Sequence, residues 1–145
     1  MQELPHTYRV GAASSPEGFV ALSSPGLSRF ESASPAEFGG PGDHWSPETL
    51  LVAAIADCFV LSFKAVARAS KFAWTSLSCE VEGVLDREDR RMQFISYRVH
   101  AVLEVPAGAD EARARRLLEK AEENCLITNS LKAPVALEAE VHRSG

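Results

Sequence analysis

The chain is 145 residues long, with 46% hydrophobic and 24% charged residues, proportions that are typical of a globular protein and exclude a disordered or fibrous one. Fifteen Lys and Arg against twenty Asp and Glu leave a formal net charge of −5. This charge argues against a nucleic-acid partner and against binding to an anionic membrane. We therefore expect a single domain over residues 1–145 that binds neither nucleic acid nor membrane.

The amino terminus and the cysteines predict a cytoplasmic protein. The first ten residues include Glu3 and lack the apolar run of a secretory signal. The most apolar run, residues 50–63, contains Asp57 and is shorter than the roughly 20 apolar residues that cross a membrane. The three cysteines, Cys58, Cys79 and Cys125, are an odd number and too few for a disulfide scaffold, which is typical of a reducing compartment.

The first 45 residues predict a small β-meander followed by a loop. Short β-rich segments at residues 7–10, 18–22 and 27–31 are separated by two turn-forming Ser-Ser-Pro sequences. Residues 32–45 are rich in glycine and proline, which favours an irregular loop. Its glycines are not a phosphate-binding loop, because the Gly-Lys-Ser/Thr of that motif is missing.

A long helix is predicted from Ser46 to about Ser70. Ser46 is suited to the N-cap, Pro47 to the first helical position, and Glu48 to the positive end of the helix dipole. The first half of this segment is apolar nearly all round, which indicates a helix enclosed on every side. A partner subunit could supply some of that cover.

The second half of the chain alternates strands and a helix. Residues 74–85 and 95–105 have apolar side chains at every second position, joined by a charged hairpin at 86–91. Residues 110–124 carry an apolar helical stripe that Cys125 extends, and residues 134–141 read as a closing strand. The order β-β-β-α-β-β-α-β favours an α+β fold over a doubly wound parallel sheet.

Taken singly, the cysteines have ordinary explanations. Cys58 lies about 18 Å along the long helix, beyond the reach of its dipole, so by itself it would be a buried core residue. Cys79 is in phase with the apolar face of its strand and is expected to be inert. Cys125 ends a core-facing stripe, although it could meet a thiol on another helix if their Cα atoms come within about 7 Å.

We expect no metal and no bound cofactor. The cysteines lack the spacing of zinc ligands, and the four histidines are dispersed at His6, His44, His100 and His142. A serine hydrolase is also disfavoured, because Gly-x-Ser-x-Gly is absent.

Two segments resemble the OsmC/Ohr family, the osmotically inducible and organic hydroperoxide resistance proteins. They are Gly-Gly-Pro-Gly-Asp-His-Trp-Ser-Pro-Glu-Thr-Leu-Leu-Val-Ala-Ala-Ile-Ala-Asp-Cys-Phe at residues 39–59 and Glu-Asn-Cys-Leu-Ile-Thr-Asn-Ser-Leu at residues 123–131. Leu126 follows the second cysteine, where the Ohr branch commonly has proline. The sequence is therefore more similar to the OsmC-like branch.

The resemblance implies an α+β OsmC-like fold, with antiparallel-rich sheets packed on a long central helix, in an intertwined homodimer. It also implies a thiol-dependent peroxidase that reduces organic hydroperoxides, with Cys58 as the peroxidatic thiol and Cys125 as the resolving thiol. The family's arginine and glutamate fall on Arg29 and Glu48, with Arg9 as a rival for the arginine. A dithiol would reset the enzyme, and in the Ohr branch this reductant is a lipoylated protein.

Spacing along the helix limits how this site could be assembled. Glu48 and Cys58 would be about 15 Å apart on a straight helix, so a bend or the second subunit would have to bring Arg29 and Glu48 to Cys58. The apolar neighbours Phe59, Leu61 and Phe63 favour an organic hydroperoxide over hydrogen peroxide. The alternatives are a non-catalytic protein on the same fold, either redox-responsive or binding an apolar ligand, and a hydrolase.

Overall fold

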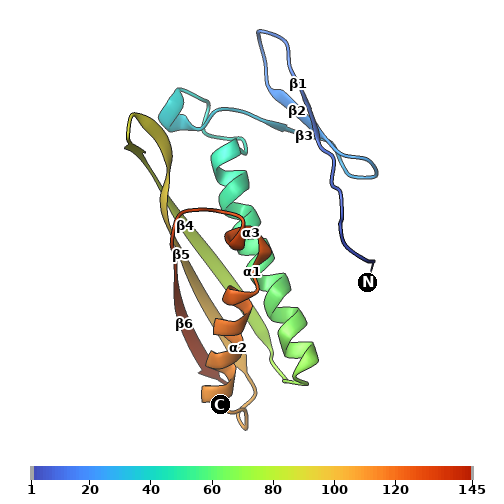
Figure 1. Ribbon diagram of the computed structural model, residues 1–145, viewed down its shortest axis with the longest axis vertical. Coiled ribbons are helices and arrows are strands. Elements are labelled where there is room, and N and C mark those ends of the chain that lie inside the picture. The colour runs from blue at the N-terminus through green and yellow to red at the C-terminus, as the bar shows by residue number, and fades with distance from the viewer. Residues whose placement is uncertain (1, 145) are drawn as a thin grey trace. The chain divides into compact units, whose positions relative to one another are not determined.

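The computed structural model describes residues 2–144, and the chain divides into two compact units, Met1–Leu50 and Leu51–Gly145. Each unit is described by itself. The elements follow the order β1-β2-β3-η1-α1-β4-β5-α2-α3-β6, with α1 beginning at the end of the first unit and continuing in the second (Figure 1). The single domain expected from the sequence stays a prediction.

The first unit contains an antiparallel three-stranded sheet in the order β1-β2-β3. Its strands are β1 (Gly11–Ala13), β2 (Val20–Ser23) and β3 (Phe30–Ser32). The predicted meander is confirmed, but the prediction of a strand at residues 7–10 is wrong, and the third strand begins three residues later than expected. Strand β1 pairs with β2 only over Gly11–Ala13. Just before β1, Ser24 Oγ donates a hydrogen bond to the Arg9 carbonyl oxygen at 2.8 Å, where a backbone pair would otherwise stand.

The predicted loop at residues 32–45 contains a short 3-10 helix, η1 (Ala36–Phe38). The two ends of the loop are held together by a parallel bridge between Ser32 and Trp45. The Ala33 N–H also donates to the Trp45 carbonyl oxygen at 2.9 Å. The glycine-rich segment is thus closed by backbone hydrogen bonds at the point where the long helix begins.

Helix α1 (Pro47–Ala69) confirms the predicted helix and its N-cap. Ser46 Oγ accepts from the Thr49 N–H at 3.1 Å, and the Ser46 N–H donates to Thr49 Oγ1 at 2.9 Å. This reciprocal pair satisfies donors that would otherwise be orphaned at the helix start. Local hydrogen bonding therefore determines the residue at which α1 begins.

The expectation that α1 is enclosed on every side is wrong for the chain by itself. Its fully buried side chains form one stripe, namely Ile55, Phe59, Phe63, Val66 and Ala67. Leu61, off that stripe, is 56% exposed. An apolar sequence does not select which faces of its helix are covered, because that depends on the elements around it.

By length and mean hydropathy alone, α1 passes the test for a helix that can cross a membrane. The core helix of a folded protein passes the same test, and the buried stripe of α1 packs in the hydrophobic core of the second unit.

The second unit is built on a three-stranded sheet in the order β4-β5-β6. Strands β4 (Ser76–Glu88) and β5 (Arg91–Val105) are antiparallel, and β6 (Val135–Arg143) is parallel to β5. The parallel pairing requires a long crossover, which α2 (Glu111–Glu123) and the short α3 (Leu126–Asn129) provide. The predicted hairpin loop at 86–91 narrows to a two-residue turn, Asp89 and Arg90, both with positive φ as a type I′ turn requires.

A β-bulge changes which side chain of β5 faces the core. The pairing register shifts between Val84 and Leu85, so Val84 is opposite Ser96 while Leu85 is opposite Phe94. The extra residue is Ile95, which the sequence pattern placed on the core face. Phe94 packs against the core instead, because a one-residue insertion reverses the alternation of side chains.

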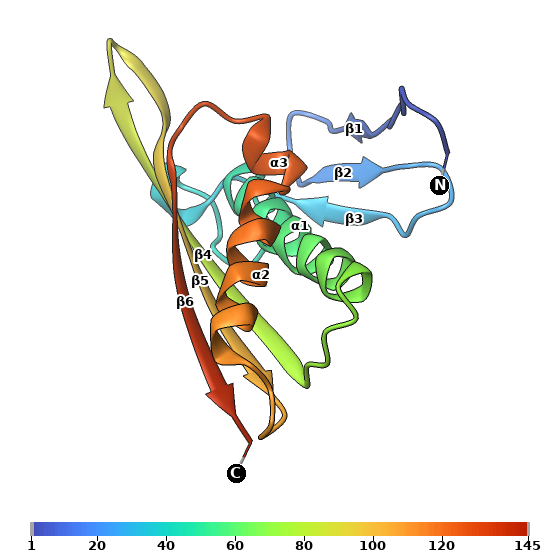
Figure 2. The same cartoon turned by 60° about the horizontal axis from the view of Figure 1, so that its bottom comes forward.

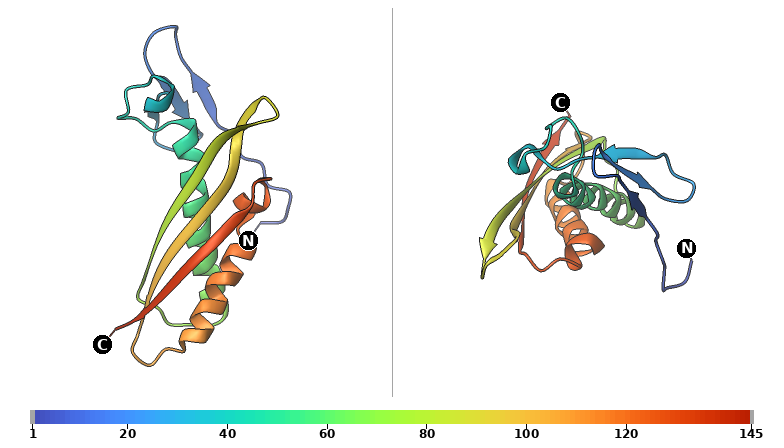
Figure 3. Two further views of the ribbon diagram at one scale, coloured as in Figure 1. Left: turned by 90° about the vertical axis from the view of Figure 1, so that its left-hand side faces the viewer. Right: turned by 90° about the horizontal axis from the view of Figure 1, so that it is seen from above.

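Both long helices pack on one face of the β4-β5-β6 sheet (Figure 2), and the other face carries no helix within this unit (Figure 3). The predicted stripe of α2 is confirmed, since Ala114, Leu117, Leu118 and Ala121 are all buried. The helix begins within a residue of the predicted start, and its N-cap is Asp110, whose carboxylate accepts from the Arg113 N–H at 3.2 Å. The core of this unit lies between the two helices and the inner face of the sheet.

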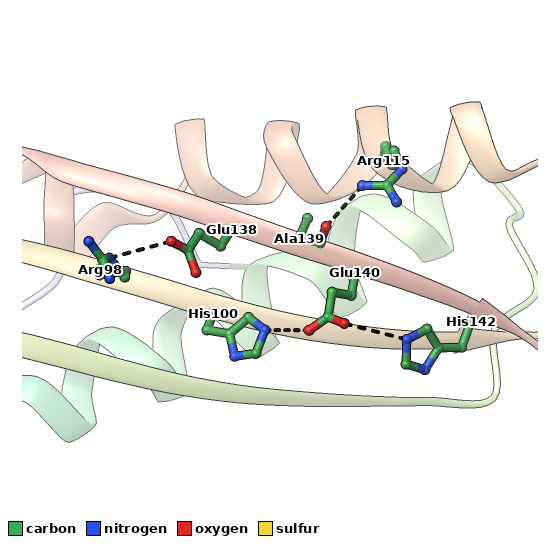
Figure 4. Close-up of polar contacts among 7 residues, drawn as sticks. All are labelled: Arg98, His100, Arg115, Glu138, Ala139, Glu140 and His142. Carbon is green, nitrogen blue, oxygen red and sulfur yellow. Dashed lines mark hydrogen bonds and ion pairs between the residues drawn. The ribbon is translucent and has the colours of Figure 1, made fainter.

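The outer face of the sheet is charged (Figure 4). Arg98 Nε is 3.5 Å from Glu138 Oε1, and the Glu140 carboxylate lies between His100 Nε2 at 2.5 Å and His142 Nε2 at 3.6 Å. All five side chains are at least 40% exposed. Water therefore screens these pairs, and such pairs contribute little to stability.

Candidate active site

Cys58 lies near the middle of α1, and its thiol is half-buried. Its Sγ atom is 3.9 Å from Oγ of Ser62, one turn further along the helix. Residues four apart share one face of a helix, so this hydroxyl stays beside the sulfur. Cys58 is therefore not one of the buried residues of α1. This differs from the prediction that Cys58, considered by itself, would be buried in the core.

Cys125 is the N-cap residue of α3, and its side chain is only 1% exposed. Its burial continues the α2 stripe, as predicted from the sequence. Its thiol lies near the Cys58 thiol, which is among the groups that raise the pKa of Cys125. Two sulfurs that are 67 positions apart in the chain are thus neighbours within the second unit.

The surroundings of Cys125 act on its pKa in opposite directions. Burial raises the pKa of the thiol, because a thiolate is poorly solvated there. The hydroxyl and backbone N–H of Thr128 lower the pKa, since both are donors that favour the thiolate, while the neighbouring Cys58 thiol raises it. Cys125 is therefore a predominantly protonated thiol that faces donors able to stabilise its ionised form.

Cys79 lies on the inner face of β4, half-buried against the core, as predicted. Burial raises the pKa of its thiol to about 11, with smaller contributions from the nearby Cys125 and Glu80. At neutral pH it is therefore almost entirely protonated, which is consistent with the expected lack of reactivity.

Glu48 lies in the first turn of α1, where its carboxylate faces the positive end of the helix dipole. One of its oxygens, Oε1, is buried and has no hydrogen-bond partner within residues 2–144. A buried carboxylate oxygen without a donor is costly, so this atom is suited to accept a hydrogen bond from a cation.

Arg29 directly precedes β3, and its side chain is exposed. In the described part of the chain it forms no ion pair with Glu48, which belongs to the same unit. Its rival Arg9 is exposed as well. The structure thus brings together the two predicted thiols, and it leaves Arg29 and Glu48 unpaired with each other over residues 2–144.

Two hydroxyl residues beside the thiols were not predicted from the sequence, namely Ser62 and Thr128. The separation of each residue from its cysteine along the chain could have identified both. Ser62 is four residues after Cys58 on a predicted helix, and Thr128 is three residues after Cys125, the separation between an N-cap residue and the backbone N–H that its side chain faces. That second signal could be used only once the short helix α3 was known.

Among residues 2–144, no group of three or more His, Cys, Asp or Glu side chains is arranged to hold a metal ion. Without a metal ion, the site can support the chemistry of a thiol pair. One sulfur of this pair is partly accessible, and the second is buried beside it.

Comparison with known proteins gives consistent matches. A model of the family described as "OsmC-like protein" matches residues 40–140. The uncharacterized protein YmaD of Bacillus subtilis (strain 168) is 30% identical over 109 residues, which cover 73% of each chain.

Two solved structures illustrate the fold. An OsmC-like protein of unknown function from Vibrio cholerae has a TM-score of 0.84 at 16% identity, covering 93% of this chain and 99% of its own. An organic hydroperoxide resistance protein OsmC from Legionella pneumophila has a TM-score of 0.75 at 26% identity, covering 97% and 99%. The OsmC-like fold predicted from the sequence is therefore confirmed, and the chain belongs to the OsmC-like protein family.

Proposed function

We propose that the protein is a thiol-dependent peroxidase that reduces organic hydroperoxides to alcohols. The observation that carries this proposal is the proximity of the Cys58 and Cys125 thiols, one half-buried and the other buried. A peroxide can reach the first sulfur, while the second is held beside it for the step that follows.

In the first step the Cys58 thiolate attacks the O–O bond of the hydroperoxide. The sulfur takes the terminal OH to become a sulfenic acid, and the alkoxide leaves and is protonated to the alcohol. In the second step the Cys125 sulfur attacks the Cys58 sulfur, which forms a disulfide and releases water. An external dithiol then reduces the disulfide and restores both thiols.

Arg29 and Glu48 complete the proposed site. A guanidinium next to Cys58 would keep its thiolate ionised, and its planar fork could donate a second hydrogen bond to a carboxylate. The buried and unpartnered Glu48 Oε1 supports this role, because it can accept such a bond. We propose an intertwined homodimer in which a second copy of the chain contributes to this arrangement.

The preference for organic hydroperoxides rests on apolar surfaces beside the thiols. Leu61, three residues after Cys58 on α1, is 56% exposed, and Leu126, next to Cys125, is 65% exposed. Phe59 and Phe63 are buried in the core and would contribute by excluding water rather than by touching a substrate. We propose that Leu61 and Leu126 contact the hydrocarbon part of the peroxide.

The remaining proposals concern the setting of the reaction. We propose that the enzyme works in the cytoplasm, where a reducing environment keeps the thiols reduced between cycles. Its physiological reductant would be a dithiol, with a lipoylated protein as the candidate to test first.

A single-turnover experiment tests this function. Reduced protein is mixed with one equivalent of cumene hydroperoxide, and thiol loss and the Cys58–Cys125 disulfide are followed by mass spectrometry. We expect stoichiometric oxidation to the disulfide, a sulfenic acid trapped at Cys58 in Cys125→Ser, and no peroxide consumption in Cys58→Ser. Slower reaction with hydrogen peroxide would support the organic preference.

Cys79→Ser is the matched control, because it removes the third thiol without touching the proposed pair. It should keep full turnover. Peroxide consumption retained in Cys58→Ser would remove Cys58 from the role of nucleophile, and consumption lost in Cys79→Ser would contradict a reaction carried by Cys58 and Cys125 alone.

A cavity in the first unit supports a second candidate function, the binding of an apolar small molecule. It has a volume of about 250 Å³ and is lined by Val10, Leu22, Ser23, Ser24, Leu27, Ser28, Phe30 and Leu50. This function predicts that Cys58→Ser protein still binds 1-anilinonaphthalene-8-sulfonate, and that Leu27→Asp abolishes the binding without slowing peroxide turnover. Equal fluorescence of the dye with both variants would eliminate this cavity as the binding site.

A further inference from the structure

Thr128 is a buried polar residue whose side-chain hydrogen bond goes to Cys125. Its side chain is 7% exposed, and its Oγ1 donates to the Cys125 carbonyl oxygen at 3.1 Å. It is also the third residue of α3, so its backbone N–H faces the side chain of the N-cap residue, which is Cys125. The residue thus holds the main chain of Cys125 through its hydroxyl, beside the buried thiol.

The thiol itself makes no N-cap hydrogen bond to the backbone of α3. A neutral thiol is a weak acceptor, whereas a thiolate is a strong one. The N–H and O–H groups of Thr128 therefore favour the ionised form of Cys125, and both lower the pKa of its thiol.

We propose that Thr128 is a positioning residue for the resolving thiol, which holds Cys125 beside Cys58 and supplies an O–H donor to its sulfur as it ionises. This inference rests on the proposed function, because it assigns Thr128 to the second step of that reaction. The hydroxyl has one proton, which lies on the Cys125 carbonyl oxygen in the resting thiol and turns to the sulfur in the thiolate. The carbonyl keeps its other donor, the Asn129 N–H at 3.0 Å.

The step that Thr128 assists is balanced within the pair. Cys125 loses its proton, and an electron pair on its sulfur forms the bond to the Cys58 sulfur. The S–O bond of the sulfenic acid breaks, and the departing hydroxide takes up the proton to give water. Thr128 exchanges no atom in this step, and its contribution is to make the buried thiolate accessible at neutral pH.

Ser130 offers a matched control on the same short helix. Its Oγ donates to the Leu126 carbonyl oxygen at 2.8 Å, so it also ties a hydroxyl to the main chain, but it is exposed. Losing this hydroxyl should affect α3 without affecting the sulfur.

The test measures disulfide formation driven by diamide, an oxidant that joins thiol pairs without any peroxide. It compares Thr128→Val, Thr128→Ser and Ser130→Ala with the unmodified protein over a range of pH. We expect Thr128→Val to form the Cys58–Cys125 disulfide about tenfold more slowly at neutral pH, with its pH midpoint displaced upward by about one unit, since a donor to a charged group is lost. Thr128→Ser should restore the rate, and Ser130→Ala should leave it unchanged.

A second measurement separates this inference from the proposed function. With cumene hydroperoxide, the Cys58 sulfenic acid should form in Thr128→Val at the unmodified rate and then persist longer. If no sulfenic acid forms in any variant, the peroxidase proposal fails, while the diamide rates still report on Thr128. An unchanged pH midpoint in Thr128→Val, or equal slowing in Ser130→Ala, would overturn the role of Thr128.

Discussion

The two faces of the β4-β5-β6 sheet place polar chemistry in opposite environments. The outer face carries charged side chains that are at least 40% exposed, and its ion pairs are formed in water. The inner face and its helices enclose Cys125 and half-bury Cys79, and burial raises the pKa of both thiols. On the inner face burial is therefore the largest cause of the pKa shifts, whereas on the outer face the largest cause of the Glu140 shift is its hydrogen-bonded partner His100.

Truncation on the inner face should have the largest effect. Leu118 is fully buried in α2, so Leu118→Ala leaves a cavity and should lower the free energy of unfolding by about 3 kcal/mol. On the outer face, Glu138→Ala should lower it by less than about 0.5 kcal/mol. Urea denaturation of both variants checks this contrast, and similar losses on the two faces would contradict it.

Replacing Arg113, which connects the end of α1 with the start of α2, should have an intermediate effect on stability. Arg113 donates from Nη2 to the Ser70 carbonyl oxygen at the end of α1, and its guanidinium is 5.4 Å from the ring centre of Phe72. Arg113→Ala should lower the free energy of unfolding by about 1–2 kcal/mol, because the partly buried Ser70 carbonyl loses its donor and the Phe72 ring loses its cation. Arg116→Ala, exposed on the same helix, is the control and should be neutral in thermal unfolding.

The raised pKa of Cys79 predicts a smaller, pH-dependent effect. Because the folded state holds this pKa near 11, above the ordinary value of 9.0, the folded protein keeps the proton at a pH where the unfolded chain releases it. The thiol therefore disfavours folding increasingly as pH rises from 9 to 11, by about 1 kcal/mol at pH 10. Cys79→Ala should flatten the fall in stability over this range, and parallel pH profiles for the two proteins would refute the prediction.

The smallest effect is expected at Glu140 on the outer face. His100 lowers the pKa of this carboxyl below its ordinary value of 4.5, with a smaller contribution from His142. Its stabilisation is therefore present above pH 4.5 and disappears as pH falls through the lowered pKa, and the gain is small because the side chain is half-exposed. NMR titration should place the Glu140 pKa below 4.5 and return it toward 4.5 in His100→Gln, with a smaller change in His142→Gln.

Local signals in the sequence identified much of the fold. The cap at Ser46 placed the start of α1 within a residue, because capping needs only neighbours in the chain, and the apolar stripe of residues 110–124 placed α2 equally well. The alternation of β4 and β5 predicted their core-facing side chains up to the bulge, where Phe94 replaced Ile95. A bulge depends on the partner strand, so the periodicity of one strand does not contain it.

The candidate site divides in the same way. The sequence by itself determined the three thiols, their separation along the chain and, through the family resemblance, which two belong together. Only the tertiary structure decided that Cys58 is half-buried while Cys125 is buried beside it, and that Thr128 and Ser62 place hydroxyls near the two sulfurs. Helix periodicity restricts which residues share a face, but the packing of α1 against the end of α2 determines which faces meet, because contacts between distant segments depend on the burial of the whole core.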